Sequence, residues 1–221
     1  MLDTVTNAVF WPAVITLIFI IVAFIAGSLP FSVWLGRSVL KQDITRYGDA
    51  NPGATNVMRA GSKKLGILAL VLDTLKALIP VAAAYYWAGV QDWRIIPIAV
   101  APIAGHAFSP FLHWRGGKAV ATTLGTWMAL TIWEGPAIGG FLLWFFSWLV
   151  GANGWAVLFM FLCMLPILLL LPPSWHLFGV PPSPLVIVGV WFFNALIVLY
   201  KHRADYAVRP QWRWQRSKQV Q

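Results

Sequence analysis

Residues that could bind a phosphate group gather in residues 47–59, inside a sequence that is otherwise mostly apolar. Asn51, Thr55 and Asn56 supply amide and hydroxyl side chains there. The turn sequence Asn-Pro-Gly ends at Gly53; proline fixes its own φ and disfavours a helical conformation at Asn51, and Gly53 permits a positive φ. Such a turn can direct several backbone N–H groups towards one anion. The alternative is a solvated basic loop held at a membrane surface.

Basic residues stand around this stretch, so that donors outnumber acceptors: Arg46, Arg59, Lys63 and Lys64. A second basic loop, residues 113–118, ends in Gly116, Gly117 and Lys118. Glycine lets the backbone approach an anion closely, and Lys118 brings a positive charge to the predicted start of a helix, whose first N–H groups are free. The loop is not a Walker A motif, because Leu112 stands where that pattern has glycine. Alone, the loop could be a basic turn, but two such loops on one face favour a phosphate site.

Other chemistries find less support in the sequence. His106 and His113 are seven residues apart, but no cysteine cluster or second carboxylate accompanies them, so we expect no metal and no cofactor. No histidine has an aspartate five positions later, which argues against acyltransferases with a His-x4-Asp motif. Nucleic-acid binding would need a soluble basic face, and the short Trp/Arg tail is better explained by membrane anchoring.

The composition indicates a membrane protein. Among 221 residues, 59% are hydrophobic and 10% are charged, against about 45–50% and about 25% in soluble domains. The net charge of +9 therefore relates first to membrane topology and anionic lipid. The single cysteine, Cys163, excludes an intramolecular disulfide. No basic residue precedes Arg37, so we expect the first apolar segment to be retained rather than cleaved as a signal peptide.

We predict an all-α membrane protein with seven transmembrane helices, at about residues 9–35, 65–87, 95–112, 119–134, 137–150, 155–171 and 185–200. All Lys and Arg residues except Lys76 and Arg94 fall in loop 37–64, loop 113–118 and the tail. Because basic loops mark the cytoplasmic face, we expect the N-terminus outside and the C-terminus inside. Residues 1–200 then form a multi-span membrane domain, and residues 201–221 form a basic cytoplasmic tail.

Three of the polar residues within the predicted spans could form specific contacts. Asp73 and Lys76 are three positions apart on one helical face and could pair. Because such residues are costly in a membrane, they form either a structural ion pair or a substrate contact. Ser28 precedes Pro30, which cannot donate to the carbonyl of Ala26, so we expect that carbonyl to be free near the Ser28 hydroxyl.

Several motifs together resemble one family. Gly-Ser-Leu-Pro at 27–30, Asp-Ile-Thr-Arg-Tyr-Gly at 43–48, Asn-Pro-Gly-Ala-Thr-Asn-Val-Met-Arg at 51–59 and Leu-Asp-Thr-Leu-Lys at 72–76 are similar to the first motif region of the PlsY family. Gly-His-Ala-Phe at 105–108 and Gly-Gly-Lys at 116–118 resemble its second region, and His-Arg at 202–203 matches its ending. These enzymes are bacterial acyl-phosphate:glycerol-3-phosphate acyltransferases.

The resemblance implies seven spans, a cytoplasmic active site, and transfer of an acyl group from acyl phosphate to glycerol 3-phosphate, giving lysophosphatidic acid. It implies a multi-pass protein of the bacterial inner membrane that contacts lipids, binds no nucleic acid and works as a monomer. The implied catalytic residues are Ser28, Arg46, Lys118 and His202. The implied substrate-binding residues are Asn51, Gly53, Thr55, Asn56, Gly116 and Gly117.

The sequence departs from the family pattern at several positions, and two of the altered regions concern the proposed site. Asp49 and Ala50 replace serine and glycine, and the Asp49 charge is unfavourable beside a phosphate site unless it pairs with Arg46 or Arg59. Near the end, Asp205 replaces asparagine, and the later arginine, glycine and glutamate positions also differ. These changes leave open an alternative, a non-catalytic relative that binds phosphate-bearing or anionic lipids at the inner face. A transporter is less favoured, because the sequence has no paired repeat halves.

The charge distribution makes the topology testable by cysteine labelling in intact cells and inverted vesicles. Cysteine at Lys41, Gly117 or Ser217 is expected to react only from the cytoplasmic side, and cysteine at Thr4 only from the outside. Labelling of Lys41→Cys or Gly117→Cys only from the outside would contradict the shared inner-face site.

Overall fold

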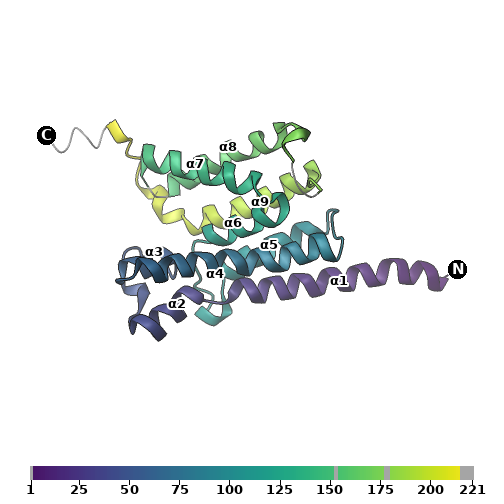
Figure 1. Ribbon diagram of the computed structural model, residues 1–221, viewed down its shortest axis with the longest axis horizontal. Coiled ribbons are helices and arrows are strands. Elements are labelled where there is room, and N and C mark those ends of the chain that lie inside the picture. Colours follow the sequence, from purple (N-terminus) through teal and green to yellow (C-terminus); the bar gives the residue numbers. More distant parts are fainter. Residues whose placement is uncertain (1, 152–153, 177–179, 215–221) are drawn as a thin grey trace.

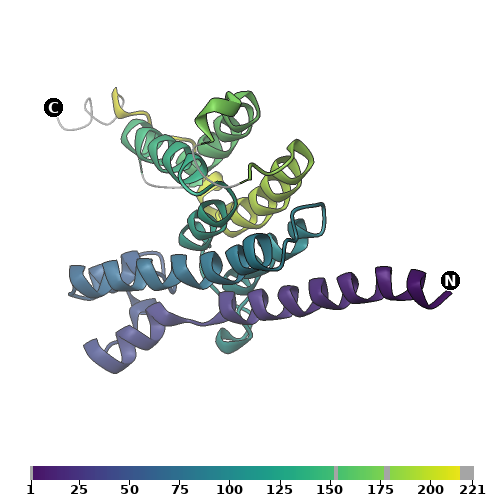
Figure 2. The same cartoon turned by 45° about the vertical axis from the view of Figure 1, so that its right-hand side comes forward.

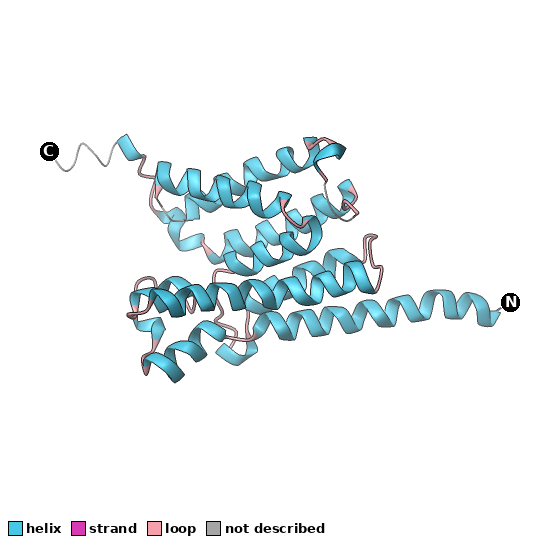
Figure 3. Cartoon of the chain, in the orientation of Figure 1, coloured by secondary structure: helices cyan, strands magenta, loops and turns pink. Residues whose placement is uncertain are grey.

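The computed structural model describes residues 2–151, 154–176 and 180–214. Within these residues the regular structure is helical and no strand is present (Figure 3). The α-helices are α1 (Leu2–Ser28), α2 (Phe31–Leu35), α3 (Ala54–Arg59), α4 (Lys63–Ala82), α5 (Ile95–Ala107), α6 (Val120–Thr131), α7 (Glu134–Val150), α8 (Gly154–Leu170) and α9 (Pro184–Lys201). Short π- or 3-10-helical turns lie at Gly36–Leu40, Ile44–Arg46, Ala83–Trp87, Pro110–Leu112, Pro173–Trp175 and Arg203–Ala207.

The long helices form two groups on either side of α6 and α9 (Figures 1 and 2). In the first, α1 lies along α5, and α4 lies beside them and packs on α6. In the second, α7 and α8 form an antiparallel hairpin that packs on α6 and α9. Tyr85, Ile98, Trp127 and Phe161 are buried in the core that joins the groups. The two groups therefore enclose α6, and the residues that precede α6 lie at their junction.

The helices are those of a multi-pass membrane protein. Among the described residues, four helical stretches are long and apolar enough to cross a membrane: Trp11–Leu40, Lys63–Trp87, Ile95–Leu112 and Pro184–Lys201. The apolar helices α7 and α8 have 17 residues each and α6 has 12. At 1.5 Å per residue α6 rises about 18 Å, short of the ~30 Å hydrocarbon core. That the chain crosses the membrane seven times, with its N-terminus outside and its C-terminus inside, stays a prediction.

The first predicted span is interrupted where its proline stands. Helix α1 ends at Ser28, and α2 begins at Phe31, after Leu29 and Pro30. The Ala26 carbonyl, expected to be free, accepts a hydrogen bond from the Leu29 N–H at 3.2 Å. That expectation was wrong, because the chain turns out of the helix at Leu29 and closes a tighter bond. The Leu29 carbonyl is instead turned towards α4, where Lys76 Nζ donates to it at 2.7 Å.

Asp73 and Lys76 of α4 form a buried ion pair, so the predicted pairing is confirmed. Lys76 Nζ lies 2.7 Å from Asp73 Oδ1, and each side chain is 3% exposed. The Ser32 hydroxyl of α2 donates to Asp73 Oδ2 at 3.0 Å. Because Lys76 also binds the Leu29 carbonyl, the pair joins α4 to both sides of the break between α1 and α2. A buried pair that is hydrogen-bonded in this way avoids the cost of an isolated buried charge.

The described part of the tail folds back onto the α7–α8 hairpin. Trp155 Nε1 at the start of α8 donates to the Val208 carbonyl at 2.8 Å. The Arg213 guanidinium lies 4.2 Å from the centre of the Trp148 ring of α7. Residues 215–221 of the predicted tail, with the labelling position Ser217, lie outside the described residues.

Removing one partner of the buried pair should destabilise the fold. Lys76→Met leaves the Asp73 carboxylate unpaired and the Leu29 carbonyl without its donor, so we expect a loss of about 3–5 kcal/mol. The measurement is reversible unfolding of the purified protein in detergent. Lys64→Met removes the same charge from an exposed position at the start of α4 and should cost less than about 0.5 kcal/mol. Equal losses in the two variants would contradict a structural role for the pair.

Candidate active site

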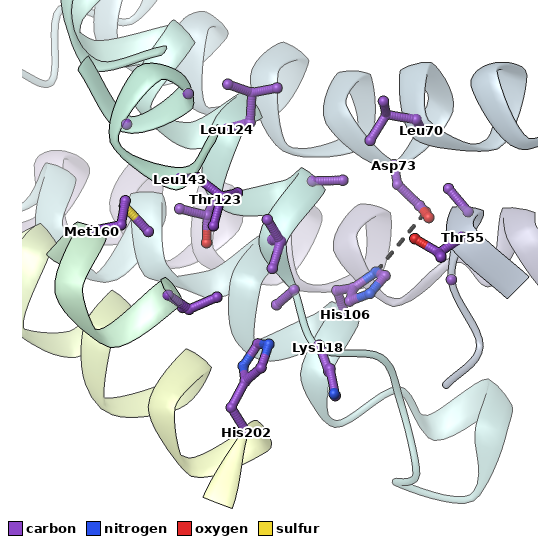
Figure 4. A pocket seen from close by; sticks show the side chains of 18 of the residues that line it. Thr55, Leu70, Asp73, His106, Lys118, Thr123, Leu124, Leu143, Met160 and His202 are labelled. Carbon is purple, nitrogen blue, oxygen red and sulfur yellow. Dashed lines mark ion pairs between the residues drawn. The ribbon is translucent and has the colours of Figure 1, made fainter. Parts of the chain in front are cut away.

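A cavity of about 480 Å³ lies between the loop before α3 and helices α4 to α8, near the end of α9 (Figure 4). One end is polar and is lined by Asp49, Asn51, Thr55, Arg59, Asp73, His106, Lys118 and His202. The other end is apolar and is lined by residues that include Leu124, Trp127, Leu143, Val157, Met160 and Met164. A single space therefore adjoins both a hydrogen-bonding, charged surface and a hydrocarbon-like one.

The turn in residues 47–59 differs in detail from the predicted turn. Gly53 has a φ of −136° and serves as the N-cap residue of α3, so it does not use the positive φ that glycine permits. The left-handed residues are Gly48 at φ 56° and Ala50 at φ 58°. A left-handed conformation costs a non-glycine residue roughly 1–2 kcal/mol. Gly53 is instead packed closely, since a Cβ there would lie 2.7 Å from Asn51 Nδ2.

Asn56 braces this turn from inside. It is 1% exposed, and its Nδ2 donates to Asp49 Oδ1 at 3.1 Å and to the Asn51 carbonyl at 2.9 Å. Its Oδ1 accepts from Arg59 Nη1 at 3.1 Å. The guanidinium passes over Gly48, where a Cβ would lie 1.9 Å from Arg59 Nη1. Asn56 thus positions Asn51 and Arg59 on the cavity wall and does not itself line the cavity.

Arg46 does not reach the cavity. Its side chain is 84% exposed, and its Nε lies 3.9 Å from Asp43 Oδ2. Arg59 lines the cavity instead, together with Asn51 and Thr55. Arg46 ends the short turn at Ile44–Arg46, whereas Arg59 ends α3, the helix that also brings Thr55 to the cavity. The geometry therefore favours Arg59 over Arg46 as the arginine of this site.

Lys118 is held between two carboxylates. Its Nζ lies 3.0 Å from Asp49 Oδ2 and 3.3 Å from Asp205 Oδ2. Asp49 pairs with Lys118 rather than with Arg46 or Arg59, because the tertiary fold brings Lys118 to the loop. Burial alone would raise the pKa of Asp49, but hydrogen bonds from Lys118, Asn51 and Asn56 outweigh it and hold that pKa below its ordinary value. Asp49 is therefore ionised at neutral pH and offsets part of the site's positive charge.

The two glycines before Lys118 allow the chain to pass against His106. A Cβ at Gly116 would lie 2.0 Å from the His106 carbonyl, and one at Gly117 would lie 2.3 Å from His106 Nε2. The Gly117 N–H donates to the His106 carbonyl at 3.0 Å, and Lys201 Nζ donates to the Gly116 carbonyl at 2.8 Å. In this structure the glycines place Lys118, and contact of either glycine with a substrate stays a prediction.

Ser28 lies at the contact of α1 with α5 rather than on the cavity wall. It is buried, and its hydroxyl donates to the Phe24 carbonyl at 2.7 Å. Its own carbonyl accepts from the Ser109 hydroxyl at 2.6 Å. A Cβ at Gly105 would lie 2.9 Å from Ser28 Oγ, so the two helices touch here. The predicted role of Ser28 at a phosphate group stays a prediction.

His202 presents one ring nitrogen to the cavity. It follows α9 and is almost fully buried. Its Nδ1 lies 2.8 Å from the Val198 carbonyl, which can only accept, so Nδ1 carries the hydrogen and Nε2 has the lone pair. Burial, reinforced by the Lys118 ammonium, lowers the pKa of His202 below its ordinary value of 6.5. His202 is therefore neutral at pH 7 and can accept a hydrogen bond or a proton through Nε2 (Figure 4).

Three contributors were not among the site residues expected from sequence. The sequence indicated Arg59 only as one of several basic residues near the turn. His106 lies with its Nδ1 3.9 Å from Asp73 Oδ1 (Figure 4), and its Gly-His-Ala-Phe motif was the signal that could have placed it. Asp205 accepts from the Gly154 N–H at 2.8 Å, so it joins the start of α8 to Lys118. In the described part of the chain no three His, Cys, Asp or Glu side chains cluster in a way that could hold a metal ion.

The sequence is similar to a family of known enzymes. A sequence model described as glycerol-3-phosphate acyltransferase matches residues 17–208. A glycerol-3-phosphate acyltransferase from Anaeromyxobacter sp. (strain Fw109-5) is 44% identical over 127 residues, which are 56% of this chain and 63% of that protein. That similarity thus spans less than two thirds of the relative's length. Glycerol-3-phosphate acyltransferase 1 from Thermotoga maritima is 34% identical over 199 residues, covering 84% of this chain and 93% of that protein.

The fold is similar to a solved membrane protein. The crystal structure of PlsY, an integral membrane glycerol 3-phosphate acyltransferase, in its glycerol 3-phosphate form superposes with a TM-score of 0.69 at 28% sequence identity. The match covers 87% of this chain and 90% of that chain. Sequence and fold therefore agree on one family.

The ion pairs of Lys118 with Asp49 and Asp205 lead to a prediction for phosphate binding. Asp205→Asn keeps an oxygen that can accept from the Gly154 N–H but removes one negative charge beside Lys118. We expect affinity for glycerol 3-phosphate to rise about twofold to fivefold, as expected for one partly exposed ion pair. Calorimetric titration of purified protein measures it.

Asp205→Ala is the matched control for the structural bond. It removes the charge and also the acceptor for the Gly154 N–H, so it should lower the free energy of unfolding by about 1 kcal/mol, whereas Asp205→Asn should not. Weaker phosphate binding in Asp205→Asn than in the unchanged protein would show that the carboxylate assists binding rather than competes with it.

Proposed function

Because the chain belongs to the glycerol-3-phosphate acyltransferase family, we propose that it transfers an acyl group from an acyl phosphate to glycerol 3-phosphate, forming lysophosphatidic acid. One observation carries the proposal: the cavity joins a cationic, hydrogen-bonding end to an apolar end. A reaction that links a phosphate-bearing alcohol to a fatty acyl chain needs both surfaces in one site. The polar end takes the phosphate groups, and the apolar end takes the hydrocarbon chain.

In this proposal Arg59 and Lys118 bind the phosphate group. Asn51 and Thr55 donate hydrogen bonds to it. Contacts of guanidinium and ammonium groups with phosphate are charge-assisted and stronger than neutral hydrogen bonds. Lys118 already lies against two carboxylates, so an arriving phosphate displaces at least one of them. The binding therefore exchanges one anion for another at a lysine that is already positioned.

The chemistry requires no nucleophilic side chain. An acyl phosphate is a mixed anhydride with a good leaving group. The glycerol hydroxyl oxygen attacks its carbonyl carbon, a C–O ester bond forms, the bond from that carbon to the phosphate oxygen breaks, and inorganic phosphate leaves. His202 Nε2 accepts the hydroxyl proton as a general base. Binding both substrates side by side and neutralising the phosphate charge supply the remaining catalysis.

We place this reaction at the cytoplasmic face of the bacterial inner membrane, with the basic loops inside. Arg59, Lys118 and His202 line one cavity within a single chain, which supports action as a monomer. The acyl phosphate donor, a fatty-acid derivative, then has access to the apolar end of the site from the surrounding lipid.

The direct test supplies purified protein with palmitoyl phosphate and glycerol 3-phosphate, and measures lysophosphatidic acid by mass spectrometry. Product is expected with acyl phosphate and none with acyl-CoA alone. Product from acyl-CoA alone would reject the donor assignment. Binding of glycerol 3-phosphate without any product would favour the non-catalytic relative that binds phosphate-bearing lipids.

The two arginines of the loop make a matched pair for testing the phosphate contact. Arg59→Ala should raise the KM for glycerol 3-phosphate by about tenfold to a hundredfold, the cost of losing a charge-assisted contact. Arg46→Ala removes the same charge from a side chain that does not line the cavity and should change KM by less than about twofold. Lys118→Ala should resemble Arg59→Ala. A larger effect at Arg46 than at Arg59 would restore the assignment made from sequence.

A further inference from the structure

The apolar end of the cavity is a passage bounded by one face of each of three helices. Helix α7 contributes Gly135, Gly139, Gly140, Leu143 and Ser147. These positions recur at helical spacing, so they share a face. Helix α6 contributes Leu124 and Trp127, and α8 contributes Val157, Met160 and Met164. Figure 4 shows Leu124, Leu143 and Met160 gathered at the end of the cavity away from His106 and Lys118.

Because α7 runs along the cavity, the position of a residue in α7 gives its distance from the polar end. Its last turn is next to the polar end, because Asp205 binds both Lys118 and the Gly154 N–H that begins α8. Its first turn is at the deep end, where a Cβ at Gly135 would lie 3.0 Å from Trp127 Cβ. From Ser147 to Gly139 the helix rises about 12 Å, and from Ser147 to Gly135 it rises about 18 Å. Half of the ~30 Å hydrocarbon core, the thickness that the acyl chains of one leaflet fill, is about 15 Å. This length lies between the two distances.

Space at this depth depends on the absence of side chains at two adjacent positions. A Cβ at Gly139 would lie 3.5 Å from Met164 Sδ, which is ordinary van der Waals contact. A Cβ at Gly140 would meet no atom within 4 Å. At Gly135 the position is already filled, since a Cβ would lie 2.7 Å from Thr131 Oγ1. A larger residue at 139 would therefore enter the passage, and one at 140 would have room beside it, at an exposed position that also lines the cavity. A larger residue at 135 would instead disturb the helix packing.

We propose that Gly139, which faces Met160 and Met164, and the adjacent Gly140 set the length of the acyl chain that this protein accepts. The inference rests on the proposed acyl transfer and names the donors within it: long-chain acyl phosphates whose distal carbons lie beside these glycines. The two methionines suit this wall, because their unbranched, flexible side chains adapt to the end of a hydrocarbon chain. Side-chain volume at 139 and 140 then limits length without altering the phosphate end, about 12 Å away along α7.

A graded series at one position tests the proposal. Gly139→Ala, Gly139→Val and Gly139→Leu are compared with the unchanged protein for transfer from octanoyl, lauroyl and palmitoyl phosphate. The ratio of kcat/KM for palmitoyl to octanoyl phosphate should fall stepwise with side-chain size, by about tenfold or more for leucine. The KM for glycerol 3-phosphate should stay within about twofold, because the phosphate end is unchanged.

Ala137→Leu is the matched control. It places the same leucine side chain on the same helix at an exposed position that does not line the cavity, and its chain-length profile should equal that of the unchanged protein. Gly140→Leu provides an independent variant if leucine at 139 prevents folding, and it should shift the profile in the same direction.

The outcomes separate this inference from the function on which it rests. Active Gly139 and Gly140 variants with an unaltered length profile would overturn the length assignment and leave acyl transfer intact. An equal shift in Ala137→Leu would overturn it too, by showing that bulk anywhere on α7 has this effect. Failure of the unchanged protein to use any of the three donors would overturn acyl transfer from acyl phosphate, and the length assignment with it.

Discussion

The site depends on the position of one ammonium group. Lys118 Nζ contacts Asp49 from the loop before α3 and Asp205 from the segment after α9, and Asp205 also binds the start of α8. One cation therefore connects the three regions whose side chains surround the polar end of the cavity. Its position depends in turn on Gly116 and Gly117, since side chains there would collide with His106. A lysine held by two carboxylates is pre-organised to receive a phosphate, at the cost of competition between that phosphate and the carboxylates.

A second polar cluster lies deeper and has a structural role. Asp73 and Lys76 satisfy each other, and they bind Ser32 and the Leu29 carbonyl across the break between α1 and α2. In a membrane, a broken helix is tolerated only where neighbouring groups satisfy the freed backbone, and this pair does so. Because Asp73 also lies 3.9 Å from His106, the cluster adjoins the cavity. The same residues thus stabilise the helix break and limit how His106 can be placed.

The structure shows what several residues that differ from the family pattern contact. Asp49 and Asp205, which replace neutral residues, both face Lys118. The added carboxylates compensate the positive charge of Arg59 and Lys118, so the site is less cationic than its basic residues suggest. Ala50 has a positive φ in the turn where the family has glycine, and the strain is tolerated because Asn56 fixes the residues on either side. Asp49, Ala50 and Asp205 thus lie in one connected region around Lys118.

The sequence alone determined the membrane class, the helical fold and the gathering of phosphate-binding residues in two loops. These properties follow from composition and from the local chemistry of proline, glycine and lysine, which depend little on distant contacts. The Asp73–Lys76 pair was also predictable, since both residues share one helical face. Only the tertiary structure decided that Arg59 rather than Arg46 faces the cavity, and that Lys118 rather than an arginine pairs with Asp49. Each of these depends on which surface of a short polar segment packs against helices far away in the chain, and spacing along the sequence carries no information about that.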